Sequence, residues 1–325
     1  MIHSISEKES NEGKFSLKNI HELPDELFTK LDGDDRQKNE EGKRPSKSYW
    51  QDAWSRFKKD RLAMIGLCFL IIMTTAAIFG PIFSEYTYER QNLANGNQPP
   101  SAEHWFGTDK FGRDIFIRTL YGARISLLIG FVAASINMVI GIIYGGVSGY
   151  FGGRVDMVLM RIVDIMIGVP DLLYIILVMM FLGNSIQSIL IALCITSWIG
   201  TARIVRSQVV TLKHQEYALA ARSIGSSNLR ILFKHLIPNS IGPIIVTVTF
   251  LVPSAIFSEA FLSFLGIGIQ VPIASWGTLV NDAIPTLFTQ PYQMLFPALA
   301  ISFTMFALNF IGDGLRDALD PRLKK

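Results

Sequence analysis

The sequence predicts an all-α polytopic membrane protein with six transmembrane helices. Half of its 325 residues are hydrophobic and only 18% are charged, and the mean hydropathy is +0.34. The charged residues are concentrated in the first sixty positions and a few short later segments, and the long stretches between them carry no charge. A soluble surface needs charges spread along the chain, so this pattern is typical of a chain that crosses a membrane.

The N-terminal region is polar before the first apolar run. Residues 1–46 are rich in charged and polar side chains with few aromatics, which predicts a disordered cytoplasmic tail. Trp50, Trp54 and Phe57 then recur at helical spacing beside basic residues, which predicts a short amphipathic helix on the inner leaflet. Since the polar start is mixed in charge, we expect no cleavable signal peptide. With the first span and the first outer loop, this helix forms residues 47–120.

Six apolar runs are long enough, at about 20 residues each, to cross a bilayer. The run from Leu172 to Ala202 is too long for one upright helix, and we expect the turn at Gly183-Asn184-Ser185 to divide it. The predicted spans are Leu62–Phe83, Ile125–Tyr150, Met157–Leu182, Ile186–Ala202, a run from after Pro238 to Ser258, and Met294–Gly312.

Basic residues set the predicted orientation, because short loops rich in Lys and Arg stay cytoplasmic. The loop between the fourth and fifth spans carries six of them, from Arg203 to Lys234, whereas the segment Phe261–Tyr292 carries none. Both termini are therefore expected in the cytoplasm. Residues 121–315 hold the last five spans with a cytoplasmic loop at 203–240, and residues 316–325 form a cytoplasmic tail.

The 203–240 loop is the most informative segment. The stretch Glu216–Gly225 predicts one short helix ended by a glycine in a left-handed conformation, and a second helix is expected to open near Ser226 or Ser227. Pro238 is expected to stop that second helix and start the fifth span. Ala220 and Ala221 place small side chains on one face, so another protein could approach the backbone closely there.

Four motifs give this chain a family resemblance. The pattern Glu-x-x-x-Ala-Ala-x-x-x-Gly at 216–225, followed by Leu-Ile-Pro-Asn at 236–239, resembles the coupling loop of ATP-binding-cassette (ABC) importer permeases. Three further strings resemble the C-type permeases of oligopeptide and dipeptide importers. They are His-Trp-Phe-Gly-Thr-Asp at 104–109 with Gly-Arg-Asp at 112–114, Glu-Ala-Phe-Leu-Ser-Phe-Leu-Gly at 259–266, and Gly-Asp-Gly-Leu-Arg-Asp-Ala-Leu-Asp-Pro at 312–321.

The resemblance implies a type I ABC importer permease fold, with residues 121–315 as its transmembrane domain in a bacterial cytoplasmic membrane. It implies a heterodimer with a B-type permease, two ATP-binding subunits below, and an extracytoplasmic peptide-binding protein. It also implies that Glu216, Ala220, Ala221, Gly225 and Pro238 belong to the segment that docks on an ATPase. Related permeases carry oligopeptides, dipeptides or nickel complexes, and overall likeness favours oligopeptides.

The chain itself lacks a Gly-x-x-x-x-Gly-Lys-Ser/Thr phosphate loop. We therefore expect a non-catalytic subunit with no cofactor of its own, ATP and Mg²⁺ being bound by partner chains. The basic loops are interpreted as topology signals, so no nucleic acid is expected. An ion-coupled transporter that works alone stays an alternative, and it would need coupling sites of its own.

Glycines recur every four residues along the second predicted span, at Gly141, Gly145 and Gly149. A face of small residues lets another helix pack closely in lipid, so we assign them to helix packing. The string Gly-Val-Ser-Gly at 146–149 also matches intramembrane serine proteases of the rhomboid type. Such a protease needs a histidine base within a span, and all five histidines lie outside the predicted spans, so this alternative is disfavoured.

Three acidic residues are candidates for the wall of a translocation path. Arg161, Asp164 and Asp171 share one face of the predicted third span, with Asp171 about 15 Å deeper than Arg161. Pro170, beside Asp171, is expected to kink this helix. An intramembrane charge is costly and usually faces a cavity or a partner. The favoured alternative is an Arg161–Asp164 ion pair with a structural Asp171. Glu259, near the outer end of the fifth span, is expected to shape an outer vestibule.

The first outer loop contains two i,i+4 charge pairs, Asp109 with Arg113 and Asp114 with Arg118, which suit a helix entering the second span. His104 lies close to both carboxylates in sequence. Because these carboxylates are assigned to arginines, we expect no metal site.

Overall fold

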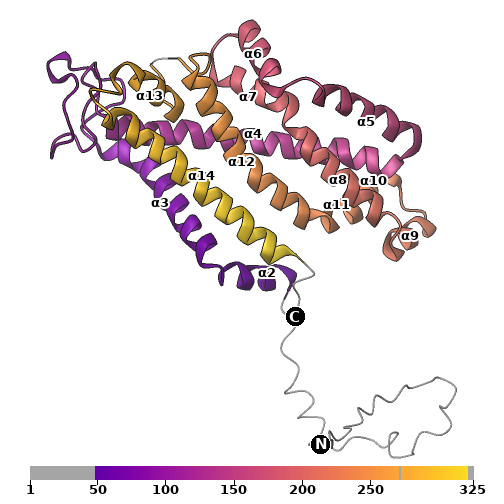
Figure 1. Cartoon of the computed structure of the whole chain (residues 1–325). Coiled ribbons are helices and arrows are strands. Elements are labelled where there is room, and N and C mark those ends of the chain that lie inside the picture. The colour runs from indigo at the N-terminus through magenta and orange to yellow at the C-terminus, as the bar shows by residue number, and fades with distance from the viewer. Residues whose placement is uncertain (1–47, 271, 321–325) are drawn as a thin grey trace, which may run out of the picture. The chain divides into compact units, whose positions relative to one another are not determined.

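The computed structural model describes residues 48–270 and 272–320, which form an all-helical bundle (Figure 1). Within these ranges the only strand-like pairing is an isolated bridge between Thr108 and Asp114. The predicted tail at 1–46 lies outside the described residues. The α-helices are α2 (Tyr49–Phe57), α3 (Arg61–Phe83), α4 (Ile115–Phe151), α5 (Gly153–Ile167), α6 (Asp171–Leu182), α7 (Ile186–Thr196), α8 (Trp198–Leu212), α9 (Glu216–Ser223), α10 (Asn228–Arg230), α11 (Ile237–Asn239), α12 (Ile241–Phe264), α13 (Trp276–Ala283) and α14 (Tyr292–Leu319). Short 3₁₀ turns η3 (Leu93–Asn95) and η5 (Ile284–Thr286) and the π-helical η4 (Ile231–Leu236) complete the order.

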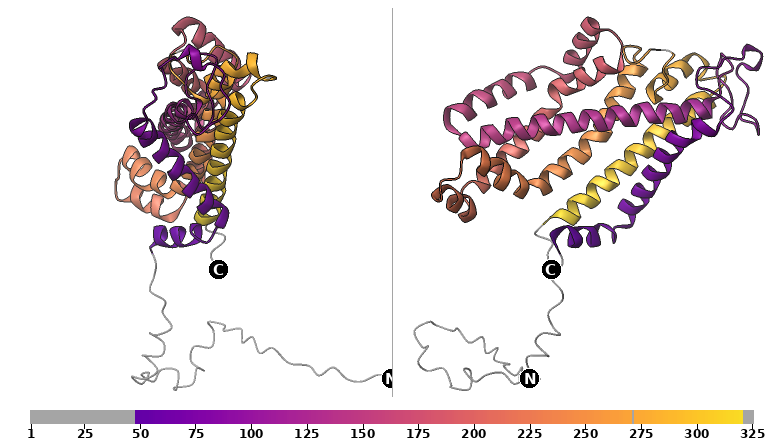
Figure 2. Two further views of the ribbon diagram at one scale, coloured as in Figure 1. Left: turned by 90° about the vertical axis from the view of Figure 1, so that its left-hand side faces the viewer. Right: turned by 180° about the vertical axis from the view of Figure 1, so that it is seen from behind.

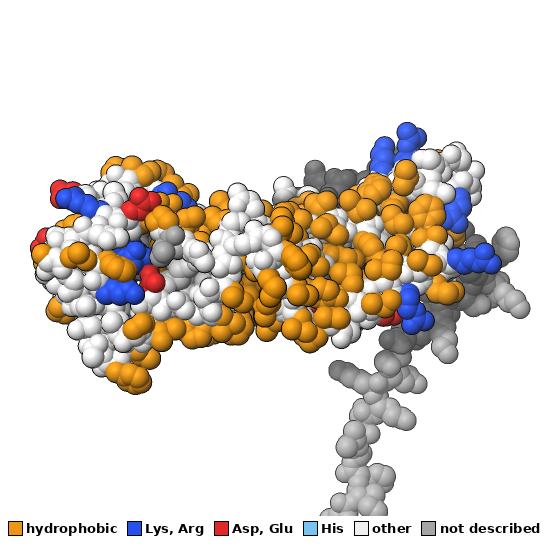
Figure 3. Space-filling view, turned by 90° about the horizontal axis from the view of Figure 1, so that it is seen from above, with side chains coloured by type: hydrophobic (Ala, Val, Ile, Leu, Met, Phe, Trp, Pro, Cys, Tyr) orange, Lys and Arg blue, Asp and Glu red, His pale blue; other side chains and the backbone are white. Residues whose placement is uncertain are grey.

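Five helical segments in the described part of the chain are long and apolar enough to cross a membrane: α3, α4, the continuous α7–α8, α12 and α14. The α5–α6 pair passes the same test together, although it is bent by 82°. Counted as one broken span, the pair brings the total to six, which confirms the predicted fold class. Figure 3 shows the corresponding surface, with a broad hydrophobic belt between two ends where charged side chains gather.

Helix α4 is the central element of the bundle. Its 37 residues run the length of the molecule (Figure 2), with α8 packed along one side and α12 and α3 along others. One end, here called the loop end, carries residues 84–114 and α13. The other, the α9 end, carries α9, the start of α12 and the last turns of α14, where Gly242 lies close to Tyr49 and Leu319.

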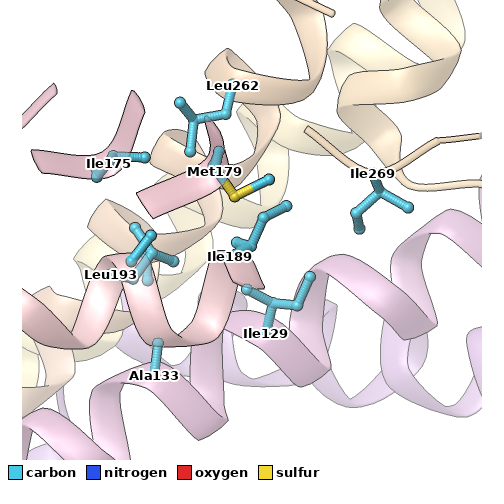
Figure 4. Close-up of a cluster of buried hydrophobic side chains, with 10 residues drawn as sticks. Ile129, Ala133, Ile175, Met179, Ile189, Leu193, Leu262 and Ile269 are labelled. Carbon is cyan, nitrogen blue, oxygen red and sulfur yellow. The ribbon is translucent and has the colours of Figure 1, made fainter. Parts of the chain in front are cut away.

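The α6–α7 hairpin packs on this framework through a cluster of aliphatic side chains (Figure 4). Ile175 and Met179 of α6 meet Ile189 and Leu193 of α7, and Leu262 of α12 closes the cluster. The Ser185 hydroxyl accepts the backbone N–H of Ser188 at 3.1 Å and so caps α7. The turn at 183–185 therefore divides the long apolar run as the sequence predicts.

The third predicted span is not one continuous helix. Helix α5 ends at Ile167 and α6 begins at Asp171, with the 82° bend at the three residues between them. Pro170 has no N–H to donate to the preceding turn and disfavours helical backbone at Val169, so the break falls there. The prediction of a helix from Met157 to Leu182 with a kink at Pro170 is therefore confirmed in the place of the bend, and it is wrong in treating the two halves as one helix.

Helices α8 and α14 extend into the segments that were predicted to be a cytoplasmic loop and a cytoplasmic tail. The fourth span continues from Ala202 to Leu212, so the first ten residues of the predicted 203–240 loop are helical. Val205 and Val209 are fully buried along this extension. The last span continues to Leu319, where Ala318 packs beside Phe57 of α2, so residues 316–319 of the predicted tail are helical too. Residues 321–325 lie outside the described residues.

Candidate functional site: a short helix at one end of the bundle

Helix α9 is bounded by the turn that its sequence indicates. Gly225 adopts a φ of +80°, a backbone conformation that favours glycine. There its N–H donates to the Arg222 carbonyl at 3.0 Å, and the next N–H, of Ser226, donates to Ala221 at 3.1 Å. Ser227 then accepts the N–H of Arg230 and opens α10. Only residues 224–227 therefore separate α9 from the second helix, α10.

One face of α9 is packed against the bundle. Ala218 and Ala221 are 3% and 6% exposed and contact a cluster that includes Val205, Val209 and Ile244. The prediction that Ala221 faces a partner protein is therefore wrong. Residues 218 and 221 are three apart, so they share the helix face that covers the end of α8.

The opposite face of α9 is exposed and partly apolar. Glu216 and Ala220, four residues apart, are both exposed. Nearby, Leu219, Ile224 and Leu229 are 46%, 82% and 60% exposed. Burial raises the pKa of the neighbouring Tyr217 phenol above its usual range. This surface, defined by Glu216, Leu219, Ala220, Ile224 and Leu229, is called the α9 face below.

Side chains from α9, from α10 and from the residue after α8 tie this region to the end of α4. The Tyr150 hydroxyl donates to Asn228 Oδ1 at 2.9 Å, and Lys213 Nζ donates to the Gly149 carbonyl at 2.8 Å. The Arg222 guanidinium lies 5.9 Å from the centre of the Tyr150 ring. Sequence reasoning missed Tyr150 and Lys213. The available signal was a tyrosine at the predicted cytoplasmic end of a glycine-rich span.

The connection from α10 to α12 is helical almost throughout. Pro238 lies inside α11 and does not stop the second helix, contrary to prediction. The π-helical turn shifts the hydrogen bonds, so that Ile237 N–H donates to Leu232, five residues back. Side chains satisfy the next carbonyls, since Asn239 Nδ2 donates to His235 at 2.6 Å and Ser240 Oγ to Leu236 at 2.9 Å. Helices α10 and α12 are thereby joined by an almost continuous helical connection.

Two ion pairs join α5 to α8. Arg206 donates to both oxygens of Asp156 at 2.5 Å, and Asp156 also accepts the Ser148 hydroxyl. Asp164 pairs with Arg203 at 2.7 Å, both side chains being half-exposed. The predicted Arg161–Asp164 pair is wrong, because the nearest cation to Asp164 comes from another helix. Sequence reasoning did not single out Asp156.

The bend between α5 and α6 also changes the position of Asp171. Asp171 is the first residue of α6 and is exposed. Its predicted depth assumed a straight helix from Arg161, so that depth and the shared face with Asp164 do not hold.

Glu259 is enclosed within the subunit. Its carboxylate is fully buried and accepts hydroxyls from Ser126 of α4 at 2.8 Å and Ser263 at 2.9 Å. Ser126 in turn accepts the backbone N–H of Trp276 at 3.3 Å. Glu259 therefore joins α4, α12 and the start of α13, and its buried carboxylate does not line a vestibule in this conformation.

Gly141, Gly145 and Gly149 lie where α4 packs directly against α8. A Cβ atom at these positions would lie 2.6 Å from Thr201 Cβ, 2.1 Å from the Ala202 oxygen and 2.7 Å from the Arg206 oxygen. No side chain larger than hydrogen fits there without moving α8.

A buried charge network lies at the loop end. Asp109 accepts Arg113 Nε and Arg118 Nη1, both at 2.6 Å, and Asp282 of α13 lies 3.3 Å from both arginines. The predicted Asp114–Arg118 pair is wrong. Asp114 instead contacts His104 Nδ1 at 2.8 Å and caps α4 by accepting the Ile117 N–H. No His, Cys, Asp and Glu cluster suited to a metal occurs in the described ranges.

The sequence is similar to two families of membrane transport proteins and to several individual permeases. Residues 122–325 match the model of the binding-protein-dependent transport system inner membrane components, and residues 48–100 match the N-terminal transmembrane domain of oligopeptide transport permease C. The chain is 51% identical to the Bacillus subtilis dipeptide transport system permease protein DppC over 306 residues, 94% of this chain and 95% of that protein. It is 53% identical to the B. subtilis oligopeptide transport system permease protein OppC over 280 residues, 86% and 92% of the two chains. The Escherichia coli OppC is 43% identical over 278 residues, 85% and 92% of the two chains.

Proposed function

The chain belongs to the binding-protein-dependent transport system inner membrane components, the permeases of ABC importers, and from this premise we propose that it forms half of a peptide translocation path. As a member of that family it is a non-catalytic, multi-pass membrane subunit of the type I permease fold. ATP and Mg²⁺ would be bound by two partner ATPases. A B-type permease would supply the other half of the path, and an extracytoplasmic binding protein would deliver the peptide.

The observation that carries this proposal is the α9 face. A short helix with exposed apolar side chains stands at the end of the bundle, yet its other face is packed into the bundle core. Leu219 of α9, Ile224 of the following turn and Leu229 of α10 bring large exposed apolar side chains together within a short segment, which is typical of a protein interface. In the proposed transporter the α9 face seats on an ATPase, with Glu216 and Ala220 at its centre and Gly225 setting the turn beside it.

The connections of α9 suggest how force would cross into the membrane. Helix α8 enters α9 after three residues, and α10, η4 and α11 continue into α12. ATP binding would draw the two ATPases together and move α9, and α8 and α12 would move with it. The cavity would change from inward-facing to outward-facing, and hydrolysis would reset it and release the peptide inside.

The proposed orientation puts the α9 end in the cytoplasm together with both termini. The basic residues of the α8–α12 region support this, because cytoplasmic loops retain Lys and Arg. The loop end would then face the outside, where a binding protein docks.

The proposed cargo is a peptide, with oligopeptides favoured because residues 48–100 match a model named for oligopeptide transport permease C. Relatives named for both cargoes are about equally similar to this chain. Asp164 and Arg203 would contribute opposite half-exposed charges to the path wall, and Asp171 would contribute one more. Such charges suit the ammonium and carboxylate ends of a peptide.

The docking role is tested by Ile224→Asp. Placing a charge at the most exposed apolar position of the α9 face should weaken ATPase binding by about 2 kcal/mol, or roughly 30-fold. The matched control is Phe288→Asp, since Phe288 is 97% exposed at the loop end. We expect Ile224→Asp to lose ATPase subunits on co-purification and to stop ATP-driven uptake, while Phe288→Asp retains them.

Equal retention of the ATPases by both variants would reject α9 as the docking element. Reconstitution of the chain alone separates the remaining alternative. Gradient-driven uptake by vesicles that contain no partner would support an ion-coupled transporter instead.

A further inference from the structure

A cavity of about 300 Å³ opens at the loop end, outside the ion network and away from the α9 face. Its walls come from the end of α3 and the segment that follows, and from residues 103–117 at the start of α4. Phe83 and Tyr86 line it from the first of these segments, and Trp105 and Phe116 line it from the second. Glu103 and Asp114 are the charged residues that line it, and none of its lining residues is basic.

Asp114, which lines this cavity, is held in place by hydrogen bonds. Asp114 caps α4 through the Ile117 N–H at 2.8 Å and holds His104 at 2.8 Å. The ring of His104 packs against Tyr86 with centroids 4.9 Å apart. A site whose side chains are already fixed loses little entropy when it is filled.

Aromatic side chains that line the cavity are exposed, although one of them also packs against a neighbouring ring. Trp105 is 63% exposed while its ring lies 4.9 Å from that of Phe116, and Phe83 is 83% exposed. Tryptophan and tyrosine lead the residues that dominate binding energy at interfaces. Aromatic faces also attract ammonium and guanidinium groups.

The charge of the cavity is negative. Burial, followed by the charges of Glu103, Asp114 and Glu85, raises the pKa of the Tyr86 phenol. The Tyr86 hydroxyl donates to Glu103 Oε1 at 3.4 Å, which keeps the carboxylate beside the aromatic wall. Asp114 is already occupied by His104 and the helix cap, so Glu103 is the carboxylate left to meet a cation.

We propose that this cavity receives a basic side chain, lysine or arginine, of the extracytoplasmic binding protein. The aliphatic stem would lie against Trp105 and Phe83, and the charged head would reach Glu103. A volume of about 300 Å³ accommodates one such side chain with water. The inference rests on the proposed function, which supplies the binding protein, and on the proposed orientation, which places the loop end outside.

The test measures binding of the cognate peptide-binding protein to the complete transporter in nanodiscs. Glu103→Gln keeps the shape and removes the charge, and Trp105→Ala removes one wall. Each should weaken binding about tenfold. Wild-type binding should also weaken as salt rises, and Glu103→Gln should show a smaller salt dependence. Glu89→Gln is the matched control, because Glu89 is an exposed glutamate of the same loop that does not line the cavity.

The possible outcomes separate this inference from the proposed function. Unchanged affinity and salt dependence in Glu103→Gln would overturn the cation site, even if Trp105→Ala binds weakly, since that pattern indicates an apolar contact alone. Equal losses in Glu103→Gln and Glu89→Gln would overturn it as well, by showing a diffuse charge effect. If the wild-type transporter bound no binding protein at all, the proposed function would fail together with the cation site.

Discussion

The Glu259 carboxylate accepts the Ser126 hydroxyl at 2.8 Å and thereby joins α12 to α4 inside the bundle. Both residues are fully buried, and no ion pair of Glu259 with a Lys or Arg is found among the described residues. Glu259 therefore depends on hydroxyl partners from the helices it joins.

Comparing the stability of Glu259→Ala with that of Glu259→Gln should show how much stability depends on the hydrogen bonds and volume of this side chain and how much on its charge. Alanine leaves Ser126 and Ser263 without their acceptor and opens a cavity, so we expect a loss of about 1–3 kcal/mol. Glutamine keeps one acceptor oxygen and most of the volume, and we expect it to retain most of the stability. Thermal unfolding of the protein in nanodiscs measures both. Equal losses would mean that the negative charge itself is required.

Gly145→Ala should destabilise the protein, because its Cβ would lie 2.1 Å from the Ala202 oxygen and would force α4 and α8 apart. Overpacking of this kind costs about 1–3 kcal/mol. Gly200→Ala provides the control on the facing helix, since its Cβ would meet nothing within 4 Å. There alanine should be neutral or stabilising by about 0.5–1 kcal/mol. A similar melting temperature for both variants would contradict the close contact.

Asp109→Asn removes the carboxylate that two buried arginines share. Arg113 and Arg118 are 4% and 1% exposed, so their charges would be left with Asp282 at the longer distance of 3.3 Å. Breaking a buried pair of this kind costs about 3–5 kcal/mol. We expect a sharp fall in the yield of folded protein by size-exclusion chromatography. The adjacent exposed residue serves as control, and Lys110→Gln should elute like the wild type.

Asp164→Asn tests the path wall without disturbing the fold. The Asp164–Arg203 pair is half-exposed on both sides, and exposed pairs contribute about 0–1 kcal/mol. We therefore expect unchanged melting and reduced peptide uptake. Asp171→Asn should behave in the same way, since Asp171 is also exposed. Normal uptake by both variants would remove these carboxylates from the proposed path.

The number of spans could be predicted because it depends on local composition. Charge-free runs mark the helices, and the turn at Gly183 or the stop at Gly225 depends on conformations that few other residues adopt. Pro170 indicated a kink, but its 82° angle depends on how α6 packs against α7 and α12. The sequence therefore indicates that the helix breaks at Pro170, but it does not indicate the angle of the bend.

The site was less predictable where it depends on partners far along the chain. Asp164 has Arg161 three residues away, yet it pairs with Arg203 from another helix. Asp114 has Arg118 at helical spacing, yet Arg118 turns to Asp109 and Asp282. Local spacing also could not show which side of α9 is covered, and so Ala221 was assigned to the wrong face. In both ion-pair errors the prediction chose a partner that is close in the sequence, whereas the fold brings a different partner close in space.

The unbroken length of α4 has a mechanical consequence. Its 37 residues span about 55 Å at 1.5 Å per residue, well beyond the roughly 30 Å of the hydrocarbon layer. One tip is anchored by Asp114 and the other by Tyr150, and Pro is absent between them. Since no proline interrupts the helix, we expect it to move as one rigid rod, so that a tilt at one end is transmitted to the other.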